Sequence, residues 1–240
     1  MRTKSLLAAA AIIAAGVASS QAQSNVYSLN VVGYVNLTVK PGYNLLAAQL
    51  KNNVGPDADI NVILTNAPTL SDGSTYFAWN DGAQDFTQAA NWVSPGSGGP
   101  NWYNADFSAL ATDQATRGKS FFIFNAGAEA TLTLVGEVPQ GAASVSVPTS
   151  YGFLGDFVPV SQEIKTNGFT IEDGATLTTF DANIQDYTPA LNGVGAGSGG
   201  PDWYNADFSS VINFAPAVGQ GFLHFSVVAP ATWNRNFTVQ

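Results

Sequence analysis

The residues best suited to bind a ligand lie in a segment that the chain carries twice. Gly96–Ser108 returns as Gly197–Ser209 at an offset of 101 residues, and the two copies differ only at Asn101 and Asp202. Aromatic faces match the apolar faces of sugar rings, and amide and carboxylate oxygens can bind sugar hydroxyls. The candidate ligand-binding residues are Trp102, Tyr103, Asn104, Asp106, Trp203, Tyr204, Asn205 and Asp207.

A structural interpretation of this segment competes with sugar binding. In it the Gly-Ser-Gly-Gly-Pro loop permits a tight reversal, Trp102 and Phe107 pack inward, and Asn104 or Asp106 caps a turn. The exposure of Trp102 and Trp203 separates the two interpretations. Exposed indoles favour glycan binding, whereas buried indoles make the segment a folding element.

A calcium site is a third interpretation. Asp81 and Asp85 place carboxylate oxygens close together around an Asp-Gly turn, and calcium prefers oxygen ligands. The second repeat has Ala182 in place of the first carboxylate, and the chain has no full EF-hand pattern. The Asp-Gly pair is also ordinary hairpin chemistry. The sequence indicates no other cofactor.

The residue inventory argues against an enzyme. The single histidine, His224, lies in an apolar run, its counterpart in the first repeat is Ile123, and no Gly-x-Ser-x-Gly elbow is present. The absence of cysteine excludes disulfides, thiolate chemistry and metal sites built on cysteine and histidine. Paired carboxylates could hydrolyse glycosides, but Asp106 and Asp207 belong to separate repeats. We therefore expect a non-catalytic protein.

The N-terminus has the three regions of a secretory signal peptide. Arg2 and Lys4 precede the apolar run Leu6–Val17, and the small residues Ser20 and Ala22 follow it. This run is short of the ~20 residues that a membrane-spanning helix needs. We expect cleavage after residue 22 and export to the periplasm, cell surface or extracellular space, without membrane insertion of the mature chain.

The mature chain is acidic. Removal of residues 1–22 leaves 6 basic and 17 acidic residues, so the formal net charge changes from −9 to −11. The basic residues are scattered, whereas nucleic acids and anionic membranes require clustered lysine and arginine. The partners that we expect are further copies of the chain, by self-assembly, or a surface glycan.

Short β-strands must position these segments. Runs of β-branched and aromatic residues alternate with turn signals about every 8–12 residues, and a helical turn is expected only within Asp57–Leu64. Val26–Val39 predicts one strand interrupted at Gly33, or two strands. Asn80-Asp81-Gly82 predicts a hairpin with a type I′ turn. The expected fold is all-β, with two tandem homologous antiparallel β-sandwich or barrel-like domains after a cleaved signal peptide. Their boundaries are 1–22, 23–138 and 139–240.

A resemblance accompanies these patterns. The motifs at 42–46, 76–80, 118–123 and 131–138 resemble the small β-domains of secreted bacterial surface proteins. The opening at 30–36 and the close at 233–239 resemble an exported bacterial family in which two tandem small β-domains follow a signal peptide. The resemblance covers essentially the whole mature chain and implies fold and export but no activity. The chain departs from the pattern at Leu223 and His224, where a second aromatic residue is usual.

These observations lead to one expected function and one alternative. We expect an exported, non-catalytic structural or adhesive protein of the cell envelope or extracellular matrix. Its long N-terminal strand can add to the sheet edge of a neighbouring subunit, which is a route to assembly. The alternative is a carbohydrate-binding module built on the repeated Trp-Tyr-Asn-Ala-Asp segment.

Overall fold

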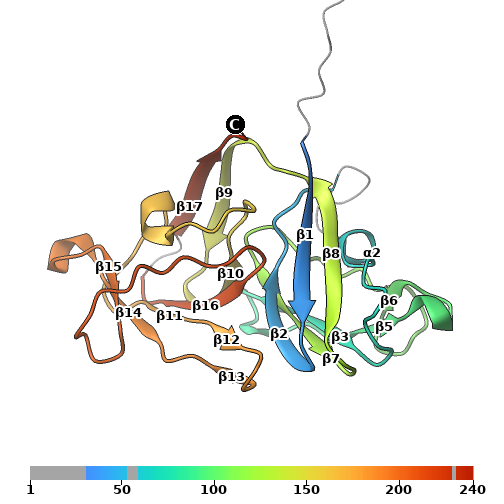
Figure 1. Ribbon diagram of the computed structural model, residues 1–240. Helices are drawn as coiled ribbons and strands as arrows, with labels where there is room; N and C mark the ends of the chain where they lie inside the picture. Colours follow the sequence, from blue (N-terminus) through green and yellow to red (C-terminus); the bar gives the residue numbers. More distant parts are fainter. Residues whose placement is uncertain (1–30, 53–58, 229–230, 240) are drawn as a thin grey trace, which may run out of the picture. The chain divides into compact units, whose positions relative to one another are not determined.

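The computed structural model describes residues 31–52, 59–228 and 231–239 (Figure 1). From Val32 onward the chain forms one compact unit. Within the described ranges no helix has the length and apolar character needed to cross a membrane. The predicted signal peptide and the first part of the predicted strand Val26–Val39 lie outside these ranges.

The first half combines a two-stranded ribbon with a larger antiparallel sheet (Figure 1). The ribbon pairs β1 (Val32–Val39) with β8 (Ala130–Glu137) along their full lengths. The sheet has the order β2-β7-β3-β5-β6, and β4 pairs with β3. Its strands are β2 (Gly42–Ala47), β3 (Thr75–Asn80), β4 (Asp85–Phe86), β5 (Ala90–Val93), β6 (Asn101–Tyr103) and β7 (Ser120–Asn125), accompanied by the short helices α2 (Ile60–Ile63) and η1 (Pro95–Ser97).

The second half has the same arrangement. A ribbon pairs β9 (Gly141–Val147) with β17 (Ala231–Phe237), and the sheet has the order β10-β16-β11-β14-β15. The strands of this sheet are β10 (Ser150–Gly155), β11 (Thr176–Thr178), β14 (Leu191–Val194), β15 (Asp202–Tyr204) and β16 (Gly221–Ser226), accompanied by the short helices η2 (Ile164–Asn167) and η3 (Ala196–Ser198). Unlike β4 of the first half, β13 (Asp186–Tyr187) pairs with β12 (Phe180–Asp181) in a separate two-stranded sheet. The all-β prediction is confirmed. The division into two homologous domains at residue 138 stays a prediction, although the strand orders match position by position.

Each ribbon packs on its own sheet to form a sandwich. Side chains alternate along β1, so Val35, Leu37 and Val39 are buried while their neighbours are exposed. They share a core cluster with Tyr76 of β3 and Ile123 of β7. Complete burial of one such aliphatic side chain contributes about 1.5–3 kcal/mol. The second half has an equivalent cluster that includes Val147, Leu154, Leu177, Phe222 and Trp233.

Three local predictions can be compared with the structure. The short helix α2 lies inside the predicted helical region and is capped by Asp59, whose carboxylate accepts from the Asn61 N–H at 2.8 Å.

The predicted interruption of the first strand at Gly33 is absent, because β1 continues through Gly33 without a break. A Cβ on Gly33 would lie 2.8 Å from Val138 Cγ2, so this glycine allows close packing rather than interrupting the strand.

The predicted hairpin at Asn80-Asp81-Gly82 exists, but its predicted turn type is wrong. β3 pairs with β4 from Trp79 opposite Phe86 to Asn80 opposite Asp85, which leaves a four-residue turn. The positive φ of this turn, 53°, belongs to Gln84 and not to Gly82. The longer turn frees the Gln84 side chain to reach the other half of the molecule.

The two halves join through contacts at matched positions. Ala47 N donates to Gly219 O at 2.8 Å, and Gly155 N donates to Gly118 O at 3.2 Å. A third apolar cluster contains residues of both halves. Its members are Leu45, Phe122 and Phe153, with Phe77, Trp79, Phe180 and Leu223 packed against them.

Two glutamines extend this junction. Tyr151 N donates to Gln84 Oε1 and Gln84 Nε2 donates to Tyr151 O, both at 2.9 Å. Tyr43 N donates to Gln185 Oε1 at 2.6 Å, and Gln185 Nε2 donates to Tyr43 O at 3.1 Å. Each side-chain amide thus pairs with an edge strand of the opposite half as a neighbouring peptide would, which satisfies exposed backbone groups.

Candidate functional site

The indoles of the repeated segment are buried. Trp102 of β6 is 0 % exposed, and its Nε1 donates to the Leu64 carbonyl at 3.0 Å. Trp203 of β15 is 1 % exposed and packs beside Phe169 and His224. The expectation that these rings form a stacking platform for sugars is therefore wrong. A three-residue strand places its middle side chain on one face, and here that face is the core side.

The polar residues of the segment hold its turn. Asn104 Nδ2 donates to Ser108 Oγ at 3.0 Å, and Ser108 N donates to Asp106 Oδ1 at 3.0 Å. Asn205 and Asp207 bond to Ser209 in the same way. Hydrogen bonds from the serine that follows lower the pKa of both Asp106 and Asp207. These side chains stabilise the turn that the structural interpretation predicts.

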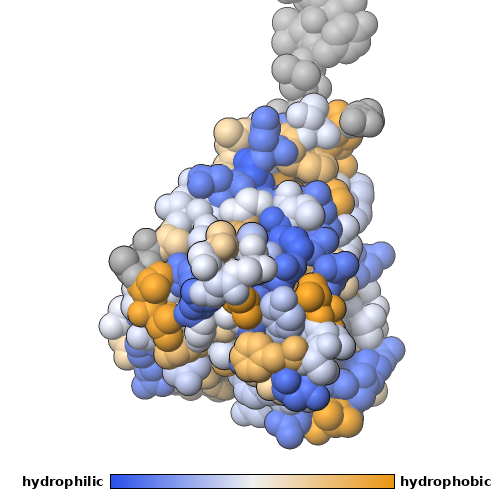
Figure 2. Space-filling view, turned by 90° about the vertical axis from the view of Figure 1, so that its left-hand side faces the viewer, coloured by the Kyte–Doolittle hydropathy of each residue, from blue (hydrophilic) through white to orange (hydrophobic). Residues whose placement is uncertain are grey.

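The exposed aromatic residues of the segment are its phenylalanines. Phe107 is 56 % and Phe208 57 % exposed, against the expectation that Phe107 packs inward. Both have a positive φ of 59°, and their rings lie 6.5 and 6.2 Å from those of the half-buried Tyr103 and Tyr204. On the side where β14 and β15 lie, Figure 2 shows hydrophobic patches that are separated by hydrophilic residues.

The single difference between the two copies has a local cause. Asp202 forms an ion pair with Lys165 of η2. At the corresponding place in the first half, Asn61 Nδ2 donates to the Trp102 carbonyl at 3.0 Å and Asn61 Oδ1 accepts from Trp102 N at 2.7 Å. The carboxylate of Asp202 therefore lies beside the ammonium group of Lys165, whereas Asn101 of the first half lies near the neutral amide of Asn61.

The carboxylates proposed for calcium have other partners. Asp81 Oδ2 accepts from Lys119 Nζ at 2.7 Å, and Asp85 Oδ1 accepts from Phe86 N at 2.8 Å. In the part of the chain that the structure describes, no three His, Cys, Asp or Glu residues group to hold a metal ion. The calcium interpretation of Asp81 and Asp85 therefore has no geometric support.

His224 is a packed ring. It is 1 % exposed, and among the described residues neither ring nitrogen has a hydrogen-bond partner. Its ring centroid lies 5.2 Å from that of Phe169 and 6.1 Å from that of Trp203. Burial lowers the pKa of His224 to about 4. The side chain is therefore neutral at pH 7 and packs as an aromatic ring.

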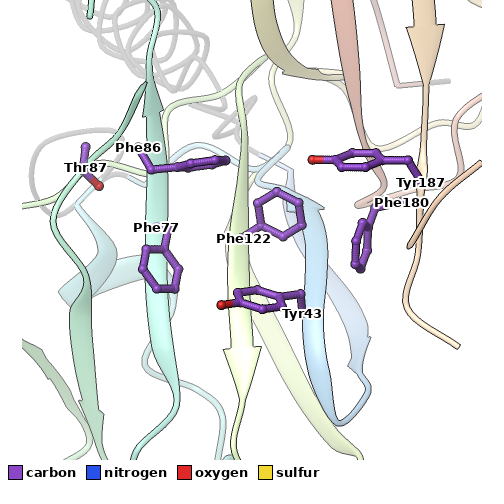
Figure 3. A pocket seen from close by; sticks show the side chains of 7 residues that line it. All are labelled: Tyr43, Phe77, Phe86, Thr87, Phe122, Phe180 and Tyr187. Atoms are coloured by element: carbon purple, nitrogen blue, oxygen red, sulfur yellow. The ribbon is translucent and has the colours of Figure 1, made fainter. Parts of the chain in front are cut away.

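Sequence reasoning missed an aromatic pocket at the junction of the halves. The pocket has a volume of about 380 Å³ and is lined by Tyr43, Phe77, Phe86, Thr87, Phe122, Phe180 and Tyr187. Figure 3 shows the other rings arranged around Phe122, whose centroid lies 6.0 Å from Tyr43, 5.8 Å from Phe86 and 5.3 Å from Phe180. The sequence signal for it was aromatic residues at equivalent positions of the repeats, such as Phe86 and Tyr187.

The edges of the first ribbon form the other candidate site. The outer edge of β8 is covered, because Lys51 and Glu137 exchange backbone hydrogen bonds of 2.9 and 2.6 Å. Thr133 N also donates to the Asn66 carbonyl at 2.9 Å. Directly opposite residues of an antiparallel pair turn their backbone groups either toward each other or both away. The residues of β1 that turn theirs away from β8 are Val32, Tyr34, Asn36 and Thr38.

Among the described residues, no strand pairs with this outer edge of β1. Within the described residues, no group hydrogen-bonds to the backbone of Val32, Tyr34 or Asn36. Tyr34 is 72 % exposed, and β1 contains neither a charged residue nor proline. Clefts of about 370 and 190 Å³ lie beside the strand, and Asn36 and Val218 border both. Such an edge is a template for another strand.

The equivalent edge in the second half is protected. Lys119 Nζ donates to the carbonyl of Ser146 on β9 at 3.0 Å and also pairs with Asp81. A lysine on an edge strand blocks pairing with another chain. The position on β1 that corresponds to Ser146 is Thr38, where no lysine is bonded. Among the described residues, the two ribbon edges therefore differ at this position, where the β9 edge has a lysine contact and the β1 edge has none.

Comparison of the chain with protein-family models, curated proteins and solved structures finds no match. The resemblance to exported two-domain proteins therefore remains an expectation. The geometry of the described residues is the basis for the function proposed below.

Proposed function

We propose that this chain is an exported, non-catalytic structural or adhesive protein of the cell envelope or extracellular matrix that assembles with copies of itself. The observation that supports this proposal is the open, uncharged edge formed by Val32, Tyr34 and Asn36 of β1. Unpaired backbone groups on an edge strand gain hydrogen bonds when a second strand adds to them.

A second copy of the same strand is the expected occupant. Two antiparallel β1 strands can satisfy each other's outward N–H and C=O groups, which gives a two-fold symmetric contact. The strand contributes no charge to that contact, although the mature chain is acidic as a whole. The remaining acidic surface keeps the assemblies soluble and disfavours unspecific association.

Sedimentation velocity over a range of concentrations tests this proposal. The mature chain should form concentration-dependent oligomers, and Tyr34→Lys should keep it monomeric, because a lysine on the edge opposes pairing. The matched control is Ala142→Lys, which adds the same charge at the equivalent exposed position of the protected strand β9. A wild-type chain that stays monomeric, or equal effects of both substitutions, would contradict the proposal.

Carbohydrate binding remains the second candidate, at different residues from those first expected. The observation that favours it is the exposed Phe107 and Phe208, each beside a half-buried tyrosine in its copy of the segment. Glycan-array binding by the mature chain that Phe107→Ala and Phe208→Ala abolish together would support this candidate. Unchanged glycan binding in the double variant would exclude these rings.

A further inference from the structure

The aromatic pocket between the halves has a lining without charge. Six of its seven lining residues are aromatic, and the seventh is Thr87. Tyr43 is 45 %, Phe86 39 % and Tyr187 38 % exposed, so the rings are accessible from solvent. An anionic ligand entering this pocket would lose hydration and meet the negative faces of the rings, which disfavours it strongly. The lining therefore selects against an anionic ligand.

The hydroxyl groups of Tyr43 and Tyr187 are available to hydrogen-bond a ligand in the pocket. Among the described residues nothing hydrogen-bonds to the hydroxyl of Tyr43 or Tyr187. The Thr87 hydroxyl is already engaged, because its oxygen accepts from Ala78 N at 3.0 Å and its side chain hydrogen-bonds to Asp113. A ligand with hydroxyls around its whole ring, such as a hexose, would leave most of them unpaired. A ligand with one or two polar groups fits better.

The corresponding positions of the second half hold other residue types. The strand positions that hold Phe77 and Phe122 in the first half hold Thr178 and Leu223 in the second half, and the second sheet pairs in the same register. Phe122 is buried in the junction cluster, whereas Tyr43, Phe86 and Tyr187 are partly exposed, so burial alone does not account for these three rings. The first half thus places aromatic rings at this part of the junction, where the second half has Thr178 and Leu223.

We propose that this pocket binds a small uncharged aromatic molecule of the phenol class. Its ring would lie among the tilted rings around Phe122, with edge-to-face contacts of the kind that Phe122 and Phe180 make at 89°. Its hydroxyl would exchange hydrogen bonds with Tyr43 or Tyr187. The volume of about 380 Å³ accommodates one such ring and lies within the usual range of ligand sites. This proposal is independent of assembly through β1.

Isothermal titration of the mature chain with p-cresol tests the proposal, with 4-methylbenzoate as the charged isostere and glucose as the sugar. We expect saturable binding of p-cresol and binding of 4-methylbenzoate that is at least about tenfold weaker. Phe77→Thr installs the residue of the second half and should weaken p-cresol binding about tenfold or more. Tyr187→Phe, which removes one hydroxyl and installs the residue type of Phe86, should weaken it about fivefold.

The control is Tyr151→Phe, at the position of the second half that corresponds to Tyr43 but outside the pocket. It should leave p-cresol binding unchanged, and near-ultraviolet circular dichroism checks the fold of each variant. If Phe77→Thr fails to fold, the p-cresol affinity of Tyr187→Phe alone tests the proposal. Absence of saturable p-cresol binding, equal effects of Tyr187→Phe and Tyr151→Phe, or tighter binding of glucose than of p-cresol would overturn the proposal.

Discussion

His224 illustrates at the residue scale how burial decides which chemistry a side chain retains. Burial lowers its pKa from 6.5 to about 4, so the folded protein holds the neutral ring while the unfolded chain takes up a proton below about pH 6.5. The unfolded state then binds more protons. The free energy of unfolding is therefore undiminished above pH 6.5 and falls as the pH decreases toward 4.

The substitution His224→Ile tests this assignment with the residue that the first repeat holds at the same position. Wild-type protein should lose up to about 3 kcal/mol of unfolding free energy through His224 between pH 6.5 and pH 4, and the variant should lack that component. Urea unfolding at several pH values measures both slopes. Equal slopes in the two proteins would mean that His224 does not remain neutral in the fold.

A buried ion pair gives a second prediction at this scale. Asp156 and Arg235 pair inside the second half at 0 % and 5 % side-chain exposure, whereas the first half holds the buried apolar residues Ala48 and Leu134 at the equivalent positions. Burial raises the pKa of Asp156, and the Arg235 guanidinium opposes that rise. Loss of one partner of a buried pair costs about 3–5 kcal/mol, but an apolar replacement of both is often neutral.

We therefore expect Arg235→Leu alone to destabilise the protein strongly, and Asp156→Ala combined with Arg235→Leu to recover most of the loss. Urea unfolding of the two single variants and the double variant forms the cycle that measures the coupling. Additive losses in the double variant would show that the second half cannot accept the apolar core of the first.

At the scale of elements, glycines in left-handed conformations let the two halves approach. Gly118 has a φ of 79°, and a Cβ on it would lie 2.2 Å from Val145 Cγ2 on β9. Gly141 has a similar φ of 81° but no neighbouring atom within 4 Å. Comparing alanine at these two positions separates backbone strain from the clash at the junction.

Gly141→Ala should cost about 1–2 kcal/mol, as expected for alanine at a left-handed position. Gly118→Ala should cost about 1–3 kcal/mol more, because its methyl group also meets Val145. Thermal or urea unfolding measures both losses. A Gly118→Ala variant no less stable than Gly141→Ala would show that the halves can separate at this contact without loss.

The sequence predicted the elements better than the site. Alternating β-branched and aromatic residues were enough to predict an all-β chain, because a strand depends on a local pattern. The helical turn expected within Asp57–Leu64 is also present, as α2. Whether Trp102 faces the core depends on how a three-residue strand packs against residues about forty positions away. The pocket could not be predicted, since Tyr43, Phe122 and Tyr187 meet only after two sheets have joined.

At the scale of the whole molecule, the two halves are alike in strand order and unlike in surface. The first half contributes the open edge of β1 and most of the aromatic pocket, and the second half contributes a ribbon edge protected by Lys119. An assembly built through one edge pairs two chains through a symmetric contact. It leaves the aromatic pocket free for a ligand, because none of the outward residues of β1 lines it.

Amide hydrogen exchange of the mature chain, followed at low and high protein concentration, tests the central claim about β1 most directly. The N–H groups of Val32, Tyr34 and Asn36 should exchange rapidly in dilute solution and become protected as concentration rises, whereas Ala142 and Ser144 on β9 should not change. If the β1 amides exchange at the same rate at both concentrations, the open edge is not where the chains assemble.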